Sequence, residues 1–174
     1  ADVGLKADGG ETVLSKALAA GDLQSVGILA DAGVDLEARV CHGRRTALMS
    51  AAADGQAEAM ALLVRKRALL ETTHDSGETA LALAVSQRHW SVVRRLAELR
   101  ANVDARCKDG SIAVTVAAGA GDVKMIDFLA DAGADLDAAD SAGRTPLASA
   151  ASRGHINAIR SLAEHRADLN GSGD

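Results

Sequence analysis

Two cysteines and five histidines are the side chains with which this chain would bind a metal ion or form a disulfide. They are Cys41, Cys107, His42, His74, His89, His155 and His165. None of them falls in the C-x-x-C or H-E-x-x-H spacings that bring zinc ligands together. The sequence therefore predicts no metal site.

Patterns for catalysis or cofactor binding are equally sparse. The chain has no G-x-S-x-G turn that would expose a nucleophilic serine. Residues 117–122, AAGAGD, resemble a dinucleotide-binding loop but lack its third glycine and the strand that precedes it. An enzyme or an enzyme inhibitor stays open as a hypothesis, although no residue set favours catalysis. The sequence predicts no catalytic residue, no cofactor and no enzyme activity.

The composition indicates helices. Hydrophobic residues make up 48% of the chain and aromatic residues only 1%, whereas strands favour β-branched and aromatic side chains. No apolar run reaches the about 18 residues that a membrane-spanning helix needs. The net charge of −5 disfavours a non-specific nucleic-acid binder. Residues 1–40 and 107–139 are predominantly acidic, and residues 65–106 are predominantly basic. This distribution indicates either a solvated surface of mixed sign or a surface whose charge matches that of a partner.

The elements that must position these side chains repeat every 33 residues. The same step separates Thr46, Thr79, Ile112 and Thr145, and it also separates Leu48, Leu81, Val114 and Leu147. A further copy begins at Thr12, 34 residues before Thr46, because Arg44 or Arg45 is inserted after Gly43. Each copy reads as a glycine-containing turn, a short helix, a break and a second helix with an apolar stripe. Such a period is typical of stacked repeats.

The pattern resembles the ankyrin repeat, whose motif is G-x-T-P-L, then A-A-x-x-G-H, then L-L-x-x-G-A-D-x-N. Its fullest copy is Gly143, Thr145, Pro146, Leu147, Ala150, Ala151, Gly154, His155, Leu162, Ala167, Asp168 and Asn170. The resemblance implies an all-α solenoid of stacked helix-turn-helix units with short β-hairpin fingers, forming one domain over residues 1–174. We expect five repeats, at about residues 7–39, 40–73, 74–106, 107–139 and 140–172.

Several positions depart from this motif. Ile112 replaces the helix-starting threonine in the fourth copy, and we expect Ser111 to cap that helix one residue early. Arg67, Arg100 and Arg166 replace the glycine that normally ends the second helix. Either those helices end differently, or the arginines adopt a left-handed backbone and partly offset its cost at the negative helix terminus.

The resemblance implies protein recognition through the fingers and the concave face of the first helices. Candidate partner-binding residues are those whose chemistry changes between copies: His42, Arg44, Arg45, Asp54, Asp75, Glu78, Gln87, Lys108, Asp109, Arg144 and Arg153. Arg44 and Arg45 are the strongest, because the insertion lengthens their finger and guanidinium groups suit carboxylate recognition. A tolerated loop insertion is the alternative for this pair, and neutral variation is the alternative for any single position. Trp90 is expected either to anchor a partner or to pack against the neighbouring unit.

Two further expectations concern assembly and location. The fifth copy keeps an internal-looking sequence, although a terminal repeat should be polar on its outer face. A structural subunit or domain fixed in a larger multiprotein assembly is therefore the alternative function. Cys41 and Cys107 lie two repeats apart, roughly 20 Å and too far for a disulfide. Free cysteines fit a reducing compartment, which predicts an intracellular, cytoplasmic protein; a removed targeting segment would leave no trace here.

Overall fold

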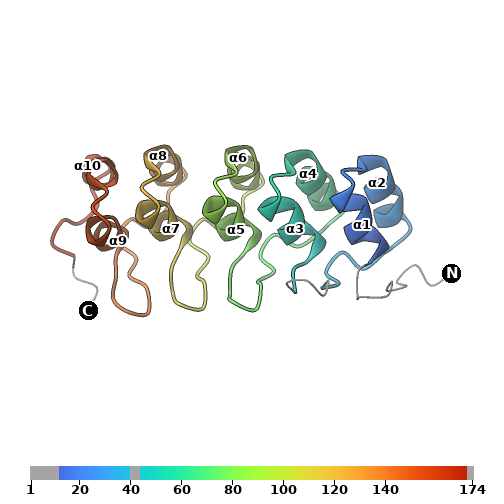
Figure 1. Ribbon diagram of the computed structural model, residues 1–174, viewed down its shortest axis with the longest axis horizontal. Coiled ribbons are helices and arrows are strands. Elements are labelled where there is room, and N and C mark those ends of the chain that lie inside the picture. The colour runs from blue at the N-terminus through green and yellow to red at the C-terminus, as the bar shows by residue number, and fades with distance from the viewer. Residues whose placement is uncertain (1–11, 40–43, 172–174) are drawn as a thin grey trace.

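A computed structural model describes residues 12–39 and 44–171, which fold into two rows of helices (Figure 1). The inner row consists of α1 (Val13–Ala19), α3 (Ala47–Ala53), α5 (Ala80–Ser86), α7 (Ala113–Gly119) and α9 (Pro146–Ser152). The outer row consists of α2 (Leu23–Asp31), α4 (Ala57–Arg65), α6 (Trp90–Glu98), α8 (Val123–Asp131) and α10 (Ile156–Glu164). We call each inner helix and the outer helix after it a repeat, numbered one to five, and the turn before an inner helix its finger. The predicted all-α solenoid is confirmed.

The inner helices begin at threonines in four repeats. The hydroxyl groups of Thr12, Thr46, Thr79 and Thr145 each accept the backbone N–H three residues on, which satisfies a free donor of the first turn. In repeat four, Ile112 provides no side-chain cap, and the Ser111 hydroxyl donates to Asp109 Oδ1 at 2.6 Å instead. The prediction that Ser111 caps this helix is wrong, because the nearby carboxylate engages its hydroxyl.

The outer helices end in a left-handed residue. Arg67, Arg100 and Arg166 have φ values of 72°, 66° and 67°, close to those of Gly33 and Gly133 at the same position. The chain therefore takes the second of the two alternatives left open by the sequence. A side chain in this conformation costs roughly 1 kcal/mol relative to glycine. The positive charge at the helix C-terminus offsets part of that cost.

The core lies between consecutive repeats. Ala51, Ala84, Ala117 and Ala150 occupy one position of the inner helices and are fully buried, so their small side chains let neighbouring helices approach closely. Leu63, Leu96, Leu129 and Leu162 are equally buried on the outer helices. Burying one such leucine contributes about 1.5–3 kcal/mol. Stability therefore arises mainly from the contacts that each repeat makes with its neighbours.

The loops after the outer helices are joined by a series of hydrogen bonds that we call the loop ladder. A carboxylate of one repeat accepts a backbone N–H of the next at 2.7–2.9 Å. The acceptors are Glu37, Glu71, Asp104 and Asp137, and the donors are the N–H groups of Leu69, Asn102, Asp135 and Asp168. Much of the acidic charge of these loops therefore holds the repeats in register.

A second set of hydrogen bonds crosses between repeats at the ends of the inner helices. The side chains of Gln56, His89 and His155 donate to the carbonyl oxygens of Leu18, Ala53 and Gly119, respectively, at 2.8–3.1 Å. Repeat four has Asp122 at this position, and its carboxylate instead accepts the Met125 N–H at the start of α8. There, Arg88 reaches forward from repeat three to the Ala120 carbonyl at 2.7 Å.

The fingers are tight turns that also contact one another. In the third, fourth and fifth fingers, a backbone N–H donates to the carbonyl four residues on, at 2.8–3.0 Å, as expected for a short hairpin. Adjacent fingers are linked by Lys108 N–H to the Ser76 carbonyl and by Ser141 N–H to the Asp109 carbonyl. Within the described ranges, no helix has the length and apolar character required to span a bilayer.

Candidate binding surface

The predicted partner-binding residues lie on the fingers and at the ends of the inner helices. Arg44, Arg45, Asp75, Glu78, Lys108, Asp109 and Arg144 are on fingers, and Asp54, Gln87 and Arg153 follow inner helices. His42 lies outside the described residues. The others are all exposed or half-exposed. Several of them are nevertheless engaged within the chain.

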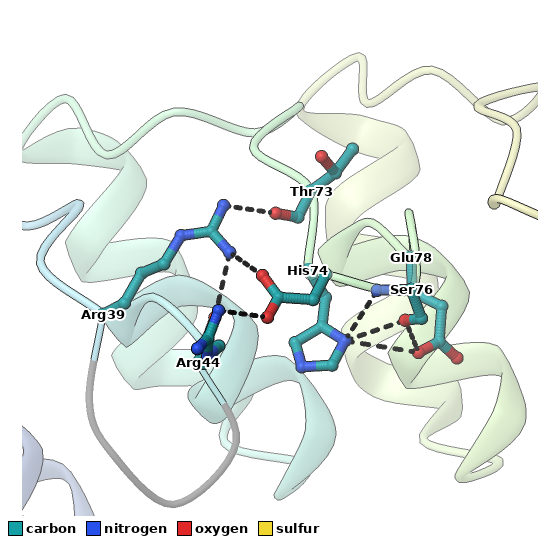
Figure 2. Close-up of polar contacts among 7 residues, drawn as sticks. Arg39, Arg44, Thr73, His74, Ser76 and Glu78 are labelled. Carbon is teal, nitrogen blue, oxygen red and sulfur yellow. Dashed lines mark hydrogen bonds and ion pairs between the residues drawn. The ribbon is translucent and has the colours of Figure 1, made fainter.

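Arg44 and Asp75, from neighbouring fingers, form an ion pair of 3.0 Å (Figure 2). Arg39 joins the same carboxylate at 2.9 Å and also donates to the Thr73 carbonyl at 2.8 Å. The Arg44 side chain remains 74% exposed. Exposed ion pairs are worth only about 0–1 kcal/mol, so a carboxylate of a partner would displace Asp75 from Arg44 at little cost.

Arg45 has a different environment from Arg44. It is half-exposed, and its Nε is buried without a hydrogen-bond partner in the described part of the chain. The two adjacent arginines therefore do not form one uniform pair of exposed guanidinium groups. Of the two arginines, Arg44 has the more exposed side chain.

The third finger brings a serine, a histidine and a carboxylate together (Figure 2). The Ser76 hydroxyl donates to Glu78 Oε2 at 2.6 Å and lies 2.8 Å from His74 Nδ1. The sequence predicted no such meeting of side chains. A catalytic triad, however, places histidine between the serine and the carboxylate so that it can remove the hydroxyl proton. Here Ser76 lies between the other two, which orders the finger and holds Glu78 in place.

A groove of about 500 Å³ runs between the third and fourth fingers. Glu78, Lys108 and Asp109, all predicted as partner-binding residues, line it together with Cys107. Asp109 is oriented by hydrogen bonds from the N–H and hydroxyl of Ser111. Burial raises the pKa of the Cys107 thiol, so it remains a neutral group rather than a nucleophilic thiolate. The groove offers charges of both signs on fixed side chains.

Arg144 of the fifth finger is bound to a buried carboxylate. Its Nε and Nη2 lie 2.9 and 2.7 Å from Asp140 Oδ2. The Asp140 side chain is 2% exposed. The Arg144 backbone N–H, its guanidinium and the Ala142 N–H lower the pKa of Asp140. Arg144 therefore stabilises its own finger as well as presenting charge to solvent.

Arg153 lies against the inner helix of the preceding repeat. A Cβ atom at Gly119 would overlap the guanidinium of Arg153 in its present position, so glycine there lets the arginine lie against the helix. Asp54 and Gln87 occupy the corresponding place after α3 and α5 and are exposed. The inner-helix ends thus present acidic, neutral and basic side chains in different repeats.

Comparison with known proteins agrees with this architecture. The family model for ankyrin repeats (3 copies) matches residues 14–107 and 98–172. The chain belongs to the ankyrin repeat family. An ankyrin repeat domain from Acinetobacter baumannii AYE has a similar crystal structure, with a TM-score of 0.87 and 27% sequence identity over 97% of this chain and 88% of that one. No curated protein matches the chain in sequence.

Ankyrin repeats generally mediate protein–protein interactions, and the family is typically non-catalytic. This ankyrin repeat protein has no cluster of three or more metal-ligating side chains within its described residues. The fingers and inner-helix ends present hydrogen-bonding and charged groups, and the rigid stack of helices holds these groups in fixed positions.

Two contributors to this surface were missed in the sequence. Asp140 orients Arg144, and its position is taken by His74 and Cys107 in the two preceding fingers, so no repeated pattern marks it. Gly119 accommodates Arg153, and a glycine inside a helical stretch was the available signal. Trp90, for which two roles were open, packs edge-to-face against Phe128 with ring centroids 6.2 Å apart.

Proposed function

We propose that this ankyrin repeat protein is a non-catalytic scaffold that binds a partner protein through its fingers and inner-helix ends. The groove between the third and fourth fingers carries the proposal. It places Glu78, Lys108 and Asp109 on one recessed surface. Hydrogen bonds preorganise two of these side chains, which lowers the entropy lost on binding.

The outer fingers extend this surface on both sides. Arg44 supplies an exposed guanidinium beside the groove, and Arg144 and Arg153 supply basic groups beyond it. A partner with alternating acidic and basic groups would complement this arrangement. Electrostatic complementarity of this kind mainly sets specificity and association rate.

Affinity capture from the native source, followed by titration of the purified partner, tests the proposal. We expect Lys108→Glu to weaken the complex about tenfold, roughly 1.4 kcal/mol, and Arg44→Glu and Arg153→Glu to weaken it less. Lys124→Glu is the matched control, because Lys124 is exposed on the outer helix α8. Unchanged affinity and unchanged salt dependence in all three finger and helix-end variants would overturn the proposal.

A second candidate function is that of a subunit fixed within a larger assembly. The C-terminal face of repeat five supports it, because apolar positions that earlier repeats bury are open there. Ala151 is exposed, whereas Val85 and Ala118 at the same position are buried, and Leu169 is 62% exposed. We expect a stacking helical unit of another subunit to cover this face. A chain that sediments as a monomer in an extract of its native source, as well as after purification, would contradict this second function.

The cytoplasm is the location that we propose for this protein. Cys107 is a free thiol in a finger groove, and free thiols persist in reducing compartments. Thiol labelling in intact cells, followed by mass spectrometry, would test whether both cysteines are reduced there.

A further inference from the structure

Within the described residues, every non-glycine residue with a positive φ is an arginine. They are Arg44, Arg67, Arg88, Arg100 and Arg166. After glycine, asparagine and aspartate are the residues that tolerate this backbone best. Repeats one and four use Gly33 and Gly133 where repeats two and three use Arg67 and Arg100. The fold therefore accepts glycine at this position, and the backbone does not require an arginine there.

Arg67 and Arg100 belong to a group of exposed arginines on the outer row. We call this group the outer basic surface, and it comprises Arg65, Arg67, Arg94, Arg95 and Arg100. Within the described residues, only Arg95 of this group has a carboxylate partner, Glu98 at 3.0 Å. Asp31 is already paired with Lys66, and Glu71 accepts an N–H of the loop ladder. Within the described residues, the other four arginines of the surface therefore have no ion pair and are open to a ligand.

A shallow groove of about 370 Å³ runs along α6 within this surface. Trp90, Arg94 and Arg95 line it, with Ser91 and Glu98. The half-exposed indole of Trp90 is fixed by its contact with Phe128. The groove therefore combines a rigid aromatic wall with guanidinium groups, the residue types enriched where binding energy concentrates.

The arginines of the outer basic surface all come from repeats two and three. Where repeat two has Arg65, repeats one and four have Asp31 and Asp131. Where repeat three has Arg94, repeat four has Asp127, whose carboxylate accepts the Ser161 hydroxyl of repeat five at 2.6 Å. The outer basic surface is thus bounded on both sides by acidic positions.

We propose that the outer basic surface binds an acidic segment of a partner protein. Guanidinium groups form paired hydrogen bonds with carboxylates. Helices in contact, such as α4 and α6, lie about 8–10 Å apart, which matches one turn of a polyproline II chain, three residues at about 3.1 Å each. Side chains three residues apart lie on the same side of such a chain. Acidic residues at every third position would reach Arg67 and Arg100 together. The short extent of the surface and the net charge of −5 favour this ligand over nucleic acid.

This surface is independent of the finger groove. In Figure 1 the outer helices lie on the side of the solenoid away from the finger turns. Both surfaces are therefore accessible to different partners at the same time, and loss of one binding activity leaves the other intact.

Fluorescence anisotropy with a labelled short poly-glutamate peptide tests the inference on the full chain. We expect binding that weakens as salt is added. We expect the double variant Arg67→Gly, Arg100→Gly to bind the peptide about tenfold more weakly. Because glycine relieves the left-handed strain, the same variant should unfold at higher denaturant concentration than the parent. Loss of binding would then not reflect unfolding.

Arg166→Gly is the matched control, since it removes an exposed left-handed arginine from the same position in repeat five. It should keep full affinity for the peptide. Equal weakening by Arg166→Gly, or no weakening by the double variant, would overturn the proposed site. Tighter binding of a single-stranded oligonucleotide or of phosphatidylserine vesicles than of the peptide would overturn the assignment of the partner as an acidic protein segment.

Discussion

Repeats three and four have the same arrangement of helices, but different hydrogen bonds hold them in place. Repeat three starts its inner helix with the Thr79 hydroxyl and donates the His89 side chain to repeat two. Repeat four starts with Ile112, which offers no side-chain cap, and has Asp122 in place of the histidine. The missing contact is supplied from outside, because Arg88 of repeat three bonds the Ala120 carbonyl.

The difference teaches that a repeat is not a self-sufficient unit. Its local hydrogen bonds are exchangeable with those of its neighbours, whereas its buried apolar positions stay the same. Leu96 and Leu129 are both fully buried at one position of α6 and α8. Substitutions made separately at the buried positions and at the polar contacts therefore measure how similar the two repeats are in packing and in hydrogen bonding.

The largest effect is expected in the core. Leu96→Ala and Leu129→Ala should each lower the free energy of unfolding by about 2–5 kcal/mol, since both leave a cavity between stacked repeats. Urea denaturation would measure the loss. A difference of more than about 2 kcal/mol between the two variants would show that the repeats differ in packing as well as in their polar contacts.

A smaller effect is expected at the helix start. Thr79→Val keeps the shape of the side chain but removes the capping oxygen, so it should destabilise the protein by about 1 kcal/mol. Thr79→Ser retains the hydroxyl and serves as the control. In repeat four, Ile112→Val removes no cap. It should lower the denaturation midpoint only by the small amount that follows from the loss of one buried methylene group. Equal losses in Thr79→Val and Thr79→Ser would contradict the capping role.

The smallest effect should appear only in acid and concerns the fingers that open repeats four and five. The Arg144 backbone N–H holds the pKa of Asp140 below its ordinary value. A lowered pKa in the folded state stabilises the protein above about pH 4 and is lost as the pH falls through that pKa. Asp140→Asn should therefore show a shallower fall of the thermal midpoint below about pH 4 than the parent. Cys107→Ser, at the corresponding position of the fourth finger, should leave the slope unchanged.

Most of the fold was predictable because identical residues recur at one period. Thr145 and Pro146 indicated a helix start, and both occupy the positions expected. The cap of α7 was predicted wrongly. Whether the Ser111 hydroxyl bonds the helix backbone or the Asp109 carboxylate depends on the shape of the turn, and here it bonds the carboxylate. Left-handed geometry was one of two alternatives at Arg100, and local propensity alone does not choose between them.

The surface was less predictable than the fold. Exposed positions such as Arg44 and Asp75 were identified one by one, but their ion pair depends on the register between fingers. The same holds for Glu37, whose bond to the Leu69 N–H joins loops 32 residues apart. Pairings of this kind follow from the rotation and rise between repeats, which no single copy of the motif encodes.

The loop ladder has a consequence for how the chain tolerates mutation. Each rung has a side-chain acceptor and a main-chain donor, and the donors belong to residues as different as Leu69, Asn102 and Asp135. Any amino acid except proline supplies the same N–H. The rung itself therefore constrains only the side chain of the acceptor. The side chains of Asn102, Asp135 and Asp168 have a separate role, because each accepts the backbone N–H two residues on. A substitution at one of these donor positions would therefore disturb its own loop while leaving the donor of the rung in place.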